Sequence, residues 1–372
     1  MCAAPQSALS KLAVGVLQRP FDALLQDCTQ RLKVMYIGAG LISDNDDLVQ
    51  RDKMSALRPT LSSILLFVGL LCLTEVASAR VQILLSHATP PYRALADAIS
   101  ADISGQSISI VDLEAEDTSP QTGIADTLNI AIGSRAMIFA LKEMPKIPLL
   151  VTLVPSNAYE ALLQSHGRAT KPDKISAVFP DQPLARQVAF VRLLMPDKRR
   201  MGILVGQHSY QYVQPLRRLA PAYGLTLQIG DAREDRISDA IKRMIAGSDF
   251  VLALHDSSLL TPNHAKWLLY MAYQRRIPVI GYSRTYVKAG ALAALFSSEE
   301  QIAHQVASIL SRSGLQDAGQ QAGHIRLPKP EYPNDFSIEV NHSVAYSFAI
   351  RRIDIQAITD QLHRSDDEGR LR

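Results

Sequence analysis

The sequence predicts an α/β protein made of two lobes, each a parallel sheet covered by helices on both faces. Three observations predict this doubly wound arrangement. The chain has 372 residues, more than one average domain of about 100–200 residues. From residue 80 onward, short apolar runs alternate with longer segments of helical period. The apolar runs are mostly continuous, which is typical of strands buried on both faces.

The first series of elements spans residues 81–154. Strands are expected at Val81–Leu85, Ser107–Val111, Leu128–Ile132 and Ile147–Val154. Helices are expected between them at Tyr92–Ile103 and Arg135–Lys142. In the first of these helices, Leu95, Ile99 and Ile103 recur every four residues, a spacing that places them on one face.

The second series spans residues 183–282 and has the same alternation. Strands are expected at Met201–Val205, Leu225–Ile229, Phe250–Leu254 and Pro278–Tyr282. Helices are expected at Pro183–Met195, Gln211–Tyr223, Ile237–Ile245 and Pro262–Gln274. Further elements are expected at Glu299–Leu310 (helix), Phe336–Val340 (strand) and from His342 to about Arg351 (helix). Residues 356–372 are expected to form a C-terminal tail with frayed, charged last residues.

Residues 54–79 have the pattern of a signal peptide. Arg58 supplies a positive charge, Leu61–Leu73 is apolar apart from two serines, and Ala77-Ser78-Ala79 offers small residues for cleavage. An apolar core of about 13 residues spans about 20 Å as a helix, which is shorter than a bilayer core of about 30 Å. We therefore expect export to the periplasm, with an uncleaved membrane anchor as the alternative.

The signal pattern begins at residue 54, although signal peptides stand at the N-terminus of a chain. We therefore expect that translation begins at Met54 and that residues 1–53 are a non-native extension. The mature protein would then begin at Arg80 or near it.

Composition and motifs argue against nucleic-acid binding and against catalysis. The net charge is only +3, and no extended basic run is present. The three cysteines, Cys2, Cys28 and Cys72, all precede residue 80, which excludes thiol chemistry from the mature part. The sequence has no nucleophile elbow, P-loop or deaminase motif. Tyr36–Leu41 lacks the third glycine of a dinucleotide-binding loop. Because all of these motifs are missing, we expect neither an enzyme nor a cofactor.

Polar residues follow the predicted strands, where open parallel sheets bind their ligands. The candidate ligand-binding residues are Ser86, His87, Ser134, Ser156, Asn157, His208, Asp256, Ser257, Tyr282 and Ser283. Serines near helix N-termini favour a carboxylate or another anion, Asp256 could hold an amine, and Tyr282 could offer an aromatic face. Ordinary helix capping explains the serines and the asparagine equally well.

Three histidines, His87, His208 and His255, follow predicted strands and could converge with Asp256 on a metal ion. They come from separate loops, with no pair spaced by four on a helix to enforce a ligand geometry. Histidines at loop tips are usually solvated or capping residues. We therefore predict no metal site.

Three stretches resemble the substrate-binding proteins of ABC transporters, in the type I branch typified by tryptophan and tyrosine binders. They are Pro278–Leu295 with the helix after it, Ile338–Asn341 with the helix after it, and Pro180–Gly206. The resemblance favours Asp256 and Ser283 as binding residues, because the family uses the equivalent strand ends. This chain departs from the family in a short first lobe without the usual glycine-rich start, which leaves the ligand open.

The resemblance also implies a hinge in which the chain crosses between the lobes three times. The crossings would lie near residues 157–175, 283–291 and 323–329. Lobe 1 would then contain residues 80–160 and 291–322, and lobe 2 residues 173–286 and 326–355.

The function that the resemblance implies is that of a periplasmic solute-binding protein. It would close its lobes around a small ligand, amino-acid-like or another small anion or zwitterion, and deliver it to an ABC permease in the inner membrane. We expect a monomer. Two alternatives stay open, namely an orphan periplasmic receptor of the same fold that feeds a sensor or an outer-membrane system, and a non-binding scaffold.

Overall fold

The computed structural model describes most of the chain from residue 80 onward. The described residues are 80–103, 106–115, 120, 127–166, 172–256, 258–259, 261–313, 325–350 and 353–369. All of them belong to one compact unit, Val76–Arg372. The predicted signal peptide 54–79 and the predicted extension 1–53 lie outside the described residues.

Lobe 1 contains a five-stranded parallel sheet in the order β2-β1-β3-β4-β5. Its strands are β1 (Arg80–Leu85), β2 (Ser107–Asp112), β3 (Thr127–Ile132), β4 (Leu149–Thr152) and β5 (Ile175–Val178). Its helices are α3 (Pro90–Asp102), α4 (Ser134–Glu143), α5 (Ser156–His166) and α11 (Glu299–Arg312), with a 3-10 turn at Pro172–Lys174. The register aligns Ile83 of β1 with Ile110 of β2 and Ile130 of β3.

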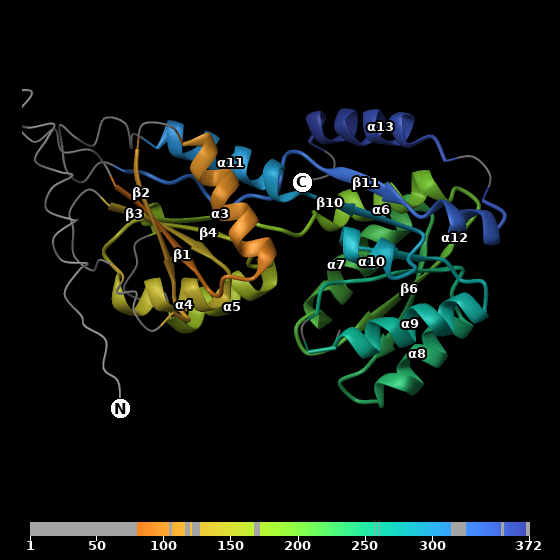
Figure 1. The fold of residues 1–372 in the computed structure, drawn as a ribbon. Coiled ribbons are helices and arrows are strands. Elements are labelled where there is room, and N and C mark those ends of the chain that lie inside the picture. The colour runs from red at the N-terminus through yellow and green to blue at the C-terminus, as the bar shows by residue number, and fades with distance from the viewer. Residues whose placement is uncertain are drawn as a thin grey trace, which may run out of the picture. The chain divides into compact units, whose positions relative to one another are not determined.

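The helices of lobe 1 cover both faces of the sheet, α3 and α11 on one face and α4 and α5 on the other (Figure 1). Alternate residues of β1 pack against the two groups of helices. Val81, Ile83 and Leu85 pack in one core cluster with residues of α3 and α11. Leu84 packs in a second cluster with residues of α4 and α5. The two clusters form because successive side chains of a strand point to opposite faces, and each face of this sheet is apolar.

Lobe 2 contains a six-stranded sheet in the order β11-β10-β9-β8-β6-β7. Its strands are β6 (Arg200–Val205), β7 (Thr226–Asp231), β8 (Phe250–Leu252), β9 (Val279–Gly281), β10 (Ala293–Phe296) and β11 (Ser337–Val340). Its helices are α6 (Leu184–Leu194), α7 (Val213–Leu219), α8 (Ile237–Ala246), α9 (Pro262–Gln274), α10 (Arg284–Lys288), α12 (His342–Ser347) and α13 (Ile355–Asp367), with 3-10 turns at Tyr210–Tyr212 and Ala220–Tyr223. Residues of α6, α7 and α13 pack in one core cluster with Met201 and Ile203, and residues of α8 and α9 pack in another with Leu204.

The predicted fold class is confirmed, since both lobes are doubly wound and their first five strands follow the same spatial order. Among the strands of the described residues, only β11 departs from the parallel arrangement, since it pairs antiparallel with β10 at the edge of the second sheet.

The predicted crossing points were wrong, because two four-residue strands escaped recognition. β5 pairs with β4, so the chain leaves lobe 1 after Val178 and not within residues 157–175. β10 pairs with β9, so the second crossing follows Phe296 and does not lie within residues 283–291. Leu327 still packs in the core of lobe 1 and Phe336 packs in that of lobe 2, which places the third crossing between them, beyond most of the predicted segment 323–329.

The sequence predicts a loose C-terminal tail, but the structure shows an ordered helix there. α13 occupies most of residues 356–372, and its Ile358 and Leu362 are buried in the core of lobe 2. The predominantly polar composition of this helix hid the two buried positions, which lie four residues apart on one face.

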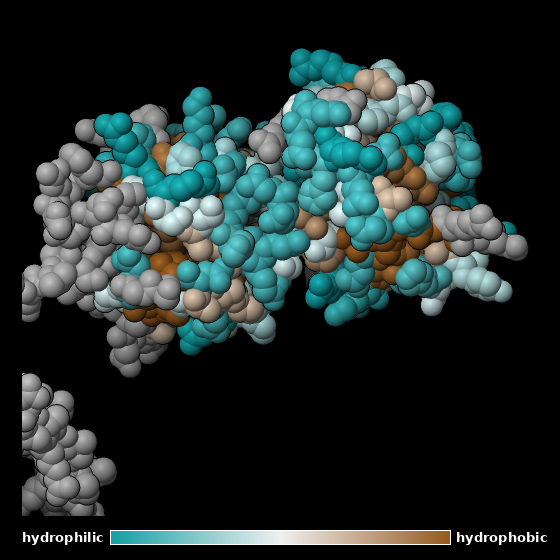
Figure 2. Space-filling view, turned by 90° about the horizontal axis from the view of Figure 1, so that it is seen from above, coloured by the Kyte–Doolittle hydropathy of each residue, from teal (hydrophilic) through white to brown (hydrophobic). Residues whose placement is uncertain are grey.

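No helix within the described parts of the chain is both long enough and apolar enough to span a bilayer. Seen from above, the described surface is mainly hydrophilic, with smaller apolar areas between the polar side chains (Figure 2).

Replacing Leu362 by alanine should lower the free energy of unfolding by about 2–5 kcal/mol, because it removes a fully buried side chain from the lobe 2 core. Urea denaturation of Leu362→Ala and of the exposed neighbour Gln361→Ala would measure the difference. Equal stability of the two variants would contradict the docked position of α13.

Candidate functional site

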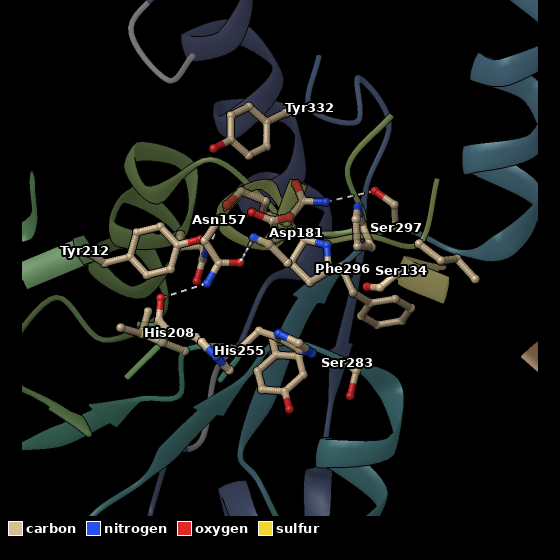
Figure 3. A pocket seen from close by; sticks show the side chains of 18 of the residues that line it. Ser134, Asn157, Asp181, His208, Tyr212, His255, Ser283, Phe296, Ser297 and Tyr332 are labelled. Atoms are coloured by element: carbon tan, nitrogen blue, oxygen red, sulfur yellow. Dashed lines mark hydrogen bonds between the residues drawn. The ribbon is translucent and has the colours of Figure 1, made fainter. Parts of the chain in front are cut away.

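A pocket of about 1000 Å³ is lined by side chains from both lobes (Figure 3). It lies at the carboxyl ends of the strands, since its walls include residues that directly follow β3 to β6 and β8 to β10. The lining side chains include Tyr92, Ser134, Asn157, Asp181, Gln182, His208, Tyr212, His255, Tyr282, Ser283, Arg284, Phe296, Ser297 and Tyr332.

Asp181 is an acidic residue of the pocket wall and lies in the first crossing segment. Its carboxylate accepts hydrogen bonds from the backbone N–H of Ser156 at 2.9 Å and from the Ser156 hydroxyl at 2.7 Å. Two tyrosine hydroxyls also approach the Ser156 oxygen, that of Tyr332 at 3.2 Å and that of Tyr212 at 3.3 Å. Because Ser156 is the first residue of α5, the carboxylate of Asp181 occupies the N-terminus of that helix.

Burial favours the uncharged form of several side chains in the pocket wall. Burial raises the pKa of Asp181, although the hydrogen bonds from Ser156 and the nearby His255 act in the opposite direction. Burial also lowers the pKa of His255, while the charges of Asp181 and Asp256 oppose that shift. Burial raises the pKa of the Tyr212 and Tyr332 hydroxyls as well. A carboxyl group with a raised pKa in a cleft is a typical feature of a functional site.

Hydrogen bonds connect the two lobes across the pocket. The side-chain amide of Asn157, in α5, donates to the backbone carbonyl of His208 in lobe 2 at 2.9 Å. The Tyr212 hydroxyl of lobe 2 lies 3.3 Å from the Ser156 hydroxyl of lobe 1. These two contacts therefore join a pocket wall of lobe 1 to a pocket wall of lobe 2.

A second set of hydrogen bonds ties the three crossing segments to one another. Gln182 of the first crossing donates to the Ser297 hydroxyl of the second at 2.8 Å, and Ser297 donates to the backbone carbonyl of Asp335 at 2.6 Å. The Arg186 guanidinium donates to the side chain of Gln182 at 2.7 Å and to the carbonyl of Pro333 at 2.8 Å. The segments that connect the lobes therefore form one bonded group.

Five of the predicted site residues line the pocket, namely Ser134, Asn157, His208, Tyr282 and Ser283. Ser283 also caps the short helix α10, because its side chain accepts from the N–H of Tyr286. For Ser283, capping and pocket lining therefore describe the same side chain.

Ser86 and His87 support the pocket wall from behind. The hydroxyl of Ser86 accepts the N–H of Ala136 and so caps α4 in place of Gly133, which precedes the helix. His87 packs edge-on against the pocket-lining ring of Tyr92, with ring centroids 4.3 Å apart. Gly133 has a φ of 90°, and a Cβ there would lie 2.5 Å from the Tyr92 ring, so glycine permits this close approach.

The carboxylate of Asp256 joins two loops of lobe 2, those after β6 and β8, and does not line the pocket. Only 1% of the residue is exposed, and its oxygens accept from the N–H and hydroxyl groups of both Ser209 and Ser258. Burial acts to raise its pKa, but these hydrogen bonds outweigh it and lower the pKa of Asp256. Ser156 likewise gives its hydrogen bonds to Asp181, so a carboxylate of the chain itself fills the anion site expected there. Ser257 lies outside the described residues.

The sequence interpretation missed Asp181, Tyr212 and Tyr332. Asp181 would have been found by the same rule as the others, had Ile175–Val178 been recognised as a strand, because it stands just after that strand. Tyr332 comes from the third crossing, and no local pattern marks it. His255, which follows a predicted strand but is absent from the predicted binding set, lies in the pocket wall.

Within the described ranges, no three histidine, cysteine, aspartate or glutamate side chains are grouped so that they could hold a metal ion. His208 and His255 both line the pocket, whereas His87 packs behind Tyr92.

Comparisons with known proteins agree on family and fold. A family model described as ABC transporter substrate binding protein matches residues 124–325. Comparison with curated protein sequences gives no significant match.

Similar solved structures include an ABC domain in complex with L-Trp from Streptococcus pneumoniae, which is 13% identical with a TM-score of 0.52 over 75% of this chain and 98% of that chain. A conserved domain protein from Vibrio cholerae is 16% identical, with a TM-score of 0.54 over 76% of this chain and 97% of that chain. A ligand-free, open substrate-binding protein with adhesive properties from Clostridium difficile is 14% identical, with a TM-score of 0.56 over 74% of this chain and 96% of that chain. At such identities these structures establish the fold, which is the predicted type I binding-protein fold.

The raised pKa of Asp181 should make the unliganded protein less stable as the pH rises. Above pH 3.8, the ordinary pKa of this carboxyl, the unfolded chain releases the proton first, so the free energy of unfolding falls until the pH passes the folded pKa. Asp181→Asn should remove this decline and be more stable than the wild type at neutral pH. Urea denaturation across the pH range would measure it.

Asp231→Asn is a matched control with the opposite sign, because hydrogen bonds from Arg233 lower the pKa of Asp231. That carboxylate contributes stability above its ordinary pKa and loses it in acid. Parallel pH profiles for the wild type and Asp181→Asn would contradict a buried, proton-retaining Asp181.

Proposed function

Because the chain belongs to the family of ABC transporter substrate-binding proteins, we propose that it captures a small amine-bearing solute, amino-acid-like in character, in the pocket between its lobes. The observation that carries this proposal is the Asp181 carboxylate, which faces a pocket walled by aromatic rings from both lobes (Figure 3).

An ammonium group is the ligand chemistry that suits Asp181. Its pKa is raised because burial disfavours the charged form, and a positive charge beside it would favour the ionised form again. The rings of Tyr212 and Tyr332 belong to the same pocket wall, and aromatic faces attract cations. The amine role that the sequence suggested for Asp256 therefore passes to Asp181.

Other parts of the wall suit the carboxylate and the side chain of an amino acid. Ser134 begins α4, where backbone N–H groups favour an anion, and Arg284 contributes a guanidinium that is shared with Glu339 at 3.0 Å. Tyr92, Tyr282 and Phe296 offer rings against which an apolar or aromatic side chain can pack. The similar domain from Streptococcus pneumoniae, in complex with L-Trp, holds a ligand of this kind.

Capture would work by closure of the lobes about the crossing segments. A ligand that touches both lobes has a higher affinity for the closed form and shifts the equilibrium toward it. The closed form would be recognised by an ABC permease, which receives the solute unchanged. The predicted signal peptide 54–79 would place this cycle in the periplasm.

An amino acid such as L-tryptophan should bind at least about tenfold more tightly than its analogue without the amine, indole-3-propionate, because a charged hydrogen bond contributes about 1.5–3 kcal/mol. Isothermal calorimetry on the wild type, Asp181→Asn and the control Asp231→Asn would measure the affinities. Asp181→Asn should lose the preference for the amine, and Asp231→Asn should keep it. Tight binding that ignores both the amine and Asp181 would overturn the amine assignment.

A thermal-shift screen of amino acids, amines and organic acids tests the wider proposal. A ligand at about 100 times its Kd stabilises the folded protein by about 2.7 kcal/mol. A screen in which no compound raises the melting temperature would favour the scaffold alternative.

A further inference from the structure

Most of the exposed aromatic side chains of the described residues belong to two helices of lobe 2, α9 and α12. Five large hydrophobic side chains are exposed among the described residues, and four of them belong to α9 or α12. They are Trp267 (39% exposed), Tyr270 (55%), Tyr273 (52%) and Tyr346 (86%), and together they are called the aromatic face.

The aromatic face is an ordered surface and not a set of scattered side chains. Trp267, Tyr270 and Tyr273 are spaced by three residues and so lie along one side of α9. The Trp267 and Tyr270 rings stack with centroids 5.9 Å apart, and the Tyr273 ring contacts Phe348, just after α12, at 5.7 Å. The opposite side of α9, which includes Leu268 and Ala272, is buried in the lobe 2 core.

The charge of this surface is positive. Lys266, Arg275 and Arg276 are exposed on α9 and the turn after it, and no acidic residue occurs between residues 257 and 298. In the neighbouring α8 region, Asp239 contacts Lys242 and Asp235 contacts Arg243. The cations of α9 are therefore not offset by acidic residues of their own segment.

Arg276 is held in a backbone conformation that favours glycine. Its φ is 55°, and the N–H of Ile277 reaches back to the carbonyl of Ala272 at 2.9 Å, as in a helix end that usually has glycine at this position. A non-glycine residue adopts this conformation at an energetic cost. Arg275 already supplies a cation to the helix end, so a second arginine is not required there by the helix dipole.

We propose that the aromatic face and its three cations dock on the anionic surface of a lipid bilayer. Tryptophan and tyrosine are the residues that concentrate at membrane–water interfaces, because one end of each ring system is apolar and the other is polar. Lysine and arginine are attracted by anionic headgroups. The rings stand along the ridge of a helix, an arrangement that suits a deformable interface better than it suits a rigid protein pocket. The docked protein would hold lobe 2 beside the membrane that contains the permease.

Trp267 provides a direct reporter of docking, because it is the only tryptophan of the chain. The chain from Val76 onward, which forms one compact unit, would be mixed with vesicles of phosphatidylglycerol or of phosphatidylcholine. Phosphatidylglycerol vesicles should shift the tryptophan emission to shorter wavelength and carry the protein into the pellet. Phosphatidylcholine vesicles should do neither.

Two variants separate this surface from overall charge. Arg275→Gln with Arg276→Gln should weaken partitioning by about fivefold for each cation removed. Arg217→Gln with Arg218→Gln, an exposed arginine pair near the end of α7, removes the same charge elsewhere in lobe 2 and should have much less effect. Tyr270→Ala with Tyr273→Ala, which keeps the reporter, should also weaken partitioning.

Three results would overturn the proposal. Equal binding to both kinds of vesicle would remove the role of anionic lipid, and equal effects of the two arginine pairs would show attraction by overall charge only. Sedimentation velocity without vesicles that shows a dimer, lost in Tyr270→Ala with Tyr273→Ala, would assign the face to a contact between two copies of the chain. None of these results bears on the ligand pocket, which is tested separately.

Discussion

The buried guanidinium of Arg186 is the constraint on which the arrangement of the two lobes depends. It forms an ion pair with Asp366 of α13 at 2.6 Å, with both side chains almost fully buried, and it donates to the first and third crossings. Breaking such a buried pair by removing one partner typically costs about 3–5 kcal/mol, because a charge is left without compensation. Gln182 extends the group to the second crossing through Ser297. One charge thus joins the C-terminal helix to every segment that connects the lobes.

The pocket depends on the same group of residues. Asp181 directly precedes Gln182 and so takes its position from the crossing that Arg186 secures. From the other side, Ser156 fixes the carboxylate at the start of α5. The acidic group of the site is therefore held by the connection between the lobes, and a motion about the crossings would move it relative to the rings of lobe 2.

The chain assigns its polar and aromatic residues to separate tasks. Asp256, Ser86 and Ser209 follow strand ends, and their side-chain hydrogen bonds join neighbouring loops or cap the start of α4. The pocket wall at these strand ends is formed by His255, Tyr282 and residues of the crossings. Trp267 and its neighbours on α9 are directed to solvent and away from the pocket, which fits a separate role for that surface in contact with the membrane.

The sequence by itself determined the two doubly wound lobes, because continuous apolar runs and helical periods are local properties of the chain. It also placed Ser134, Asn157, His208, Tyr282 and Ser283 at the carboxyl ends of strands, where the pocket lies. Only the tertiary structure decided that β5 and β10 complete the sheets, that α13 packs on lobe 2 and that Asp181 and Tyr332 meet near Ser156. The physical reason is that a strand of four residues is defined by its partner strand, and a polar side chain at a strand end becomes a cap or a pocket wall according to which distant groups use its hydrogen bonds.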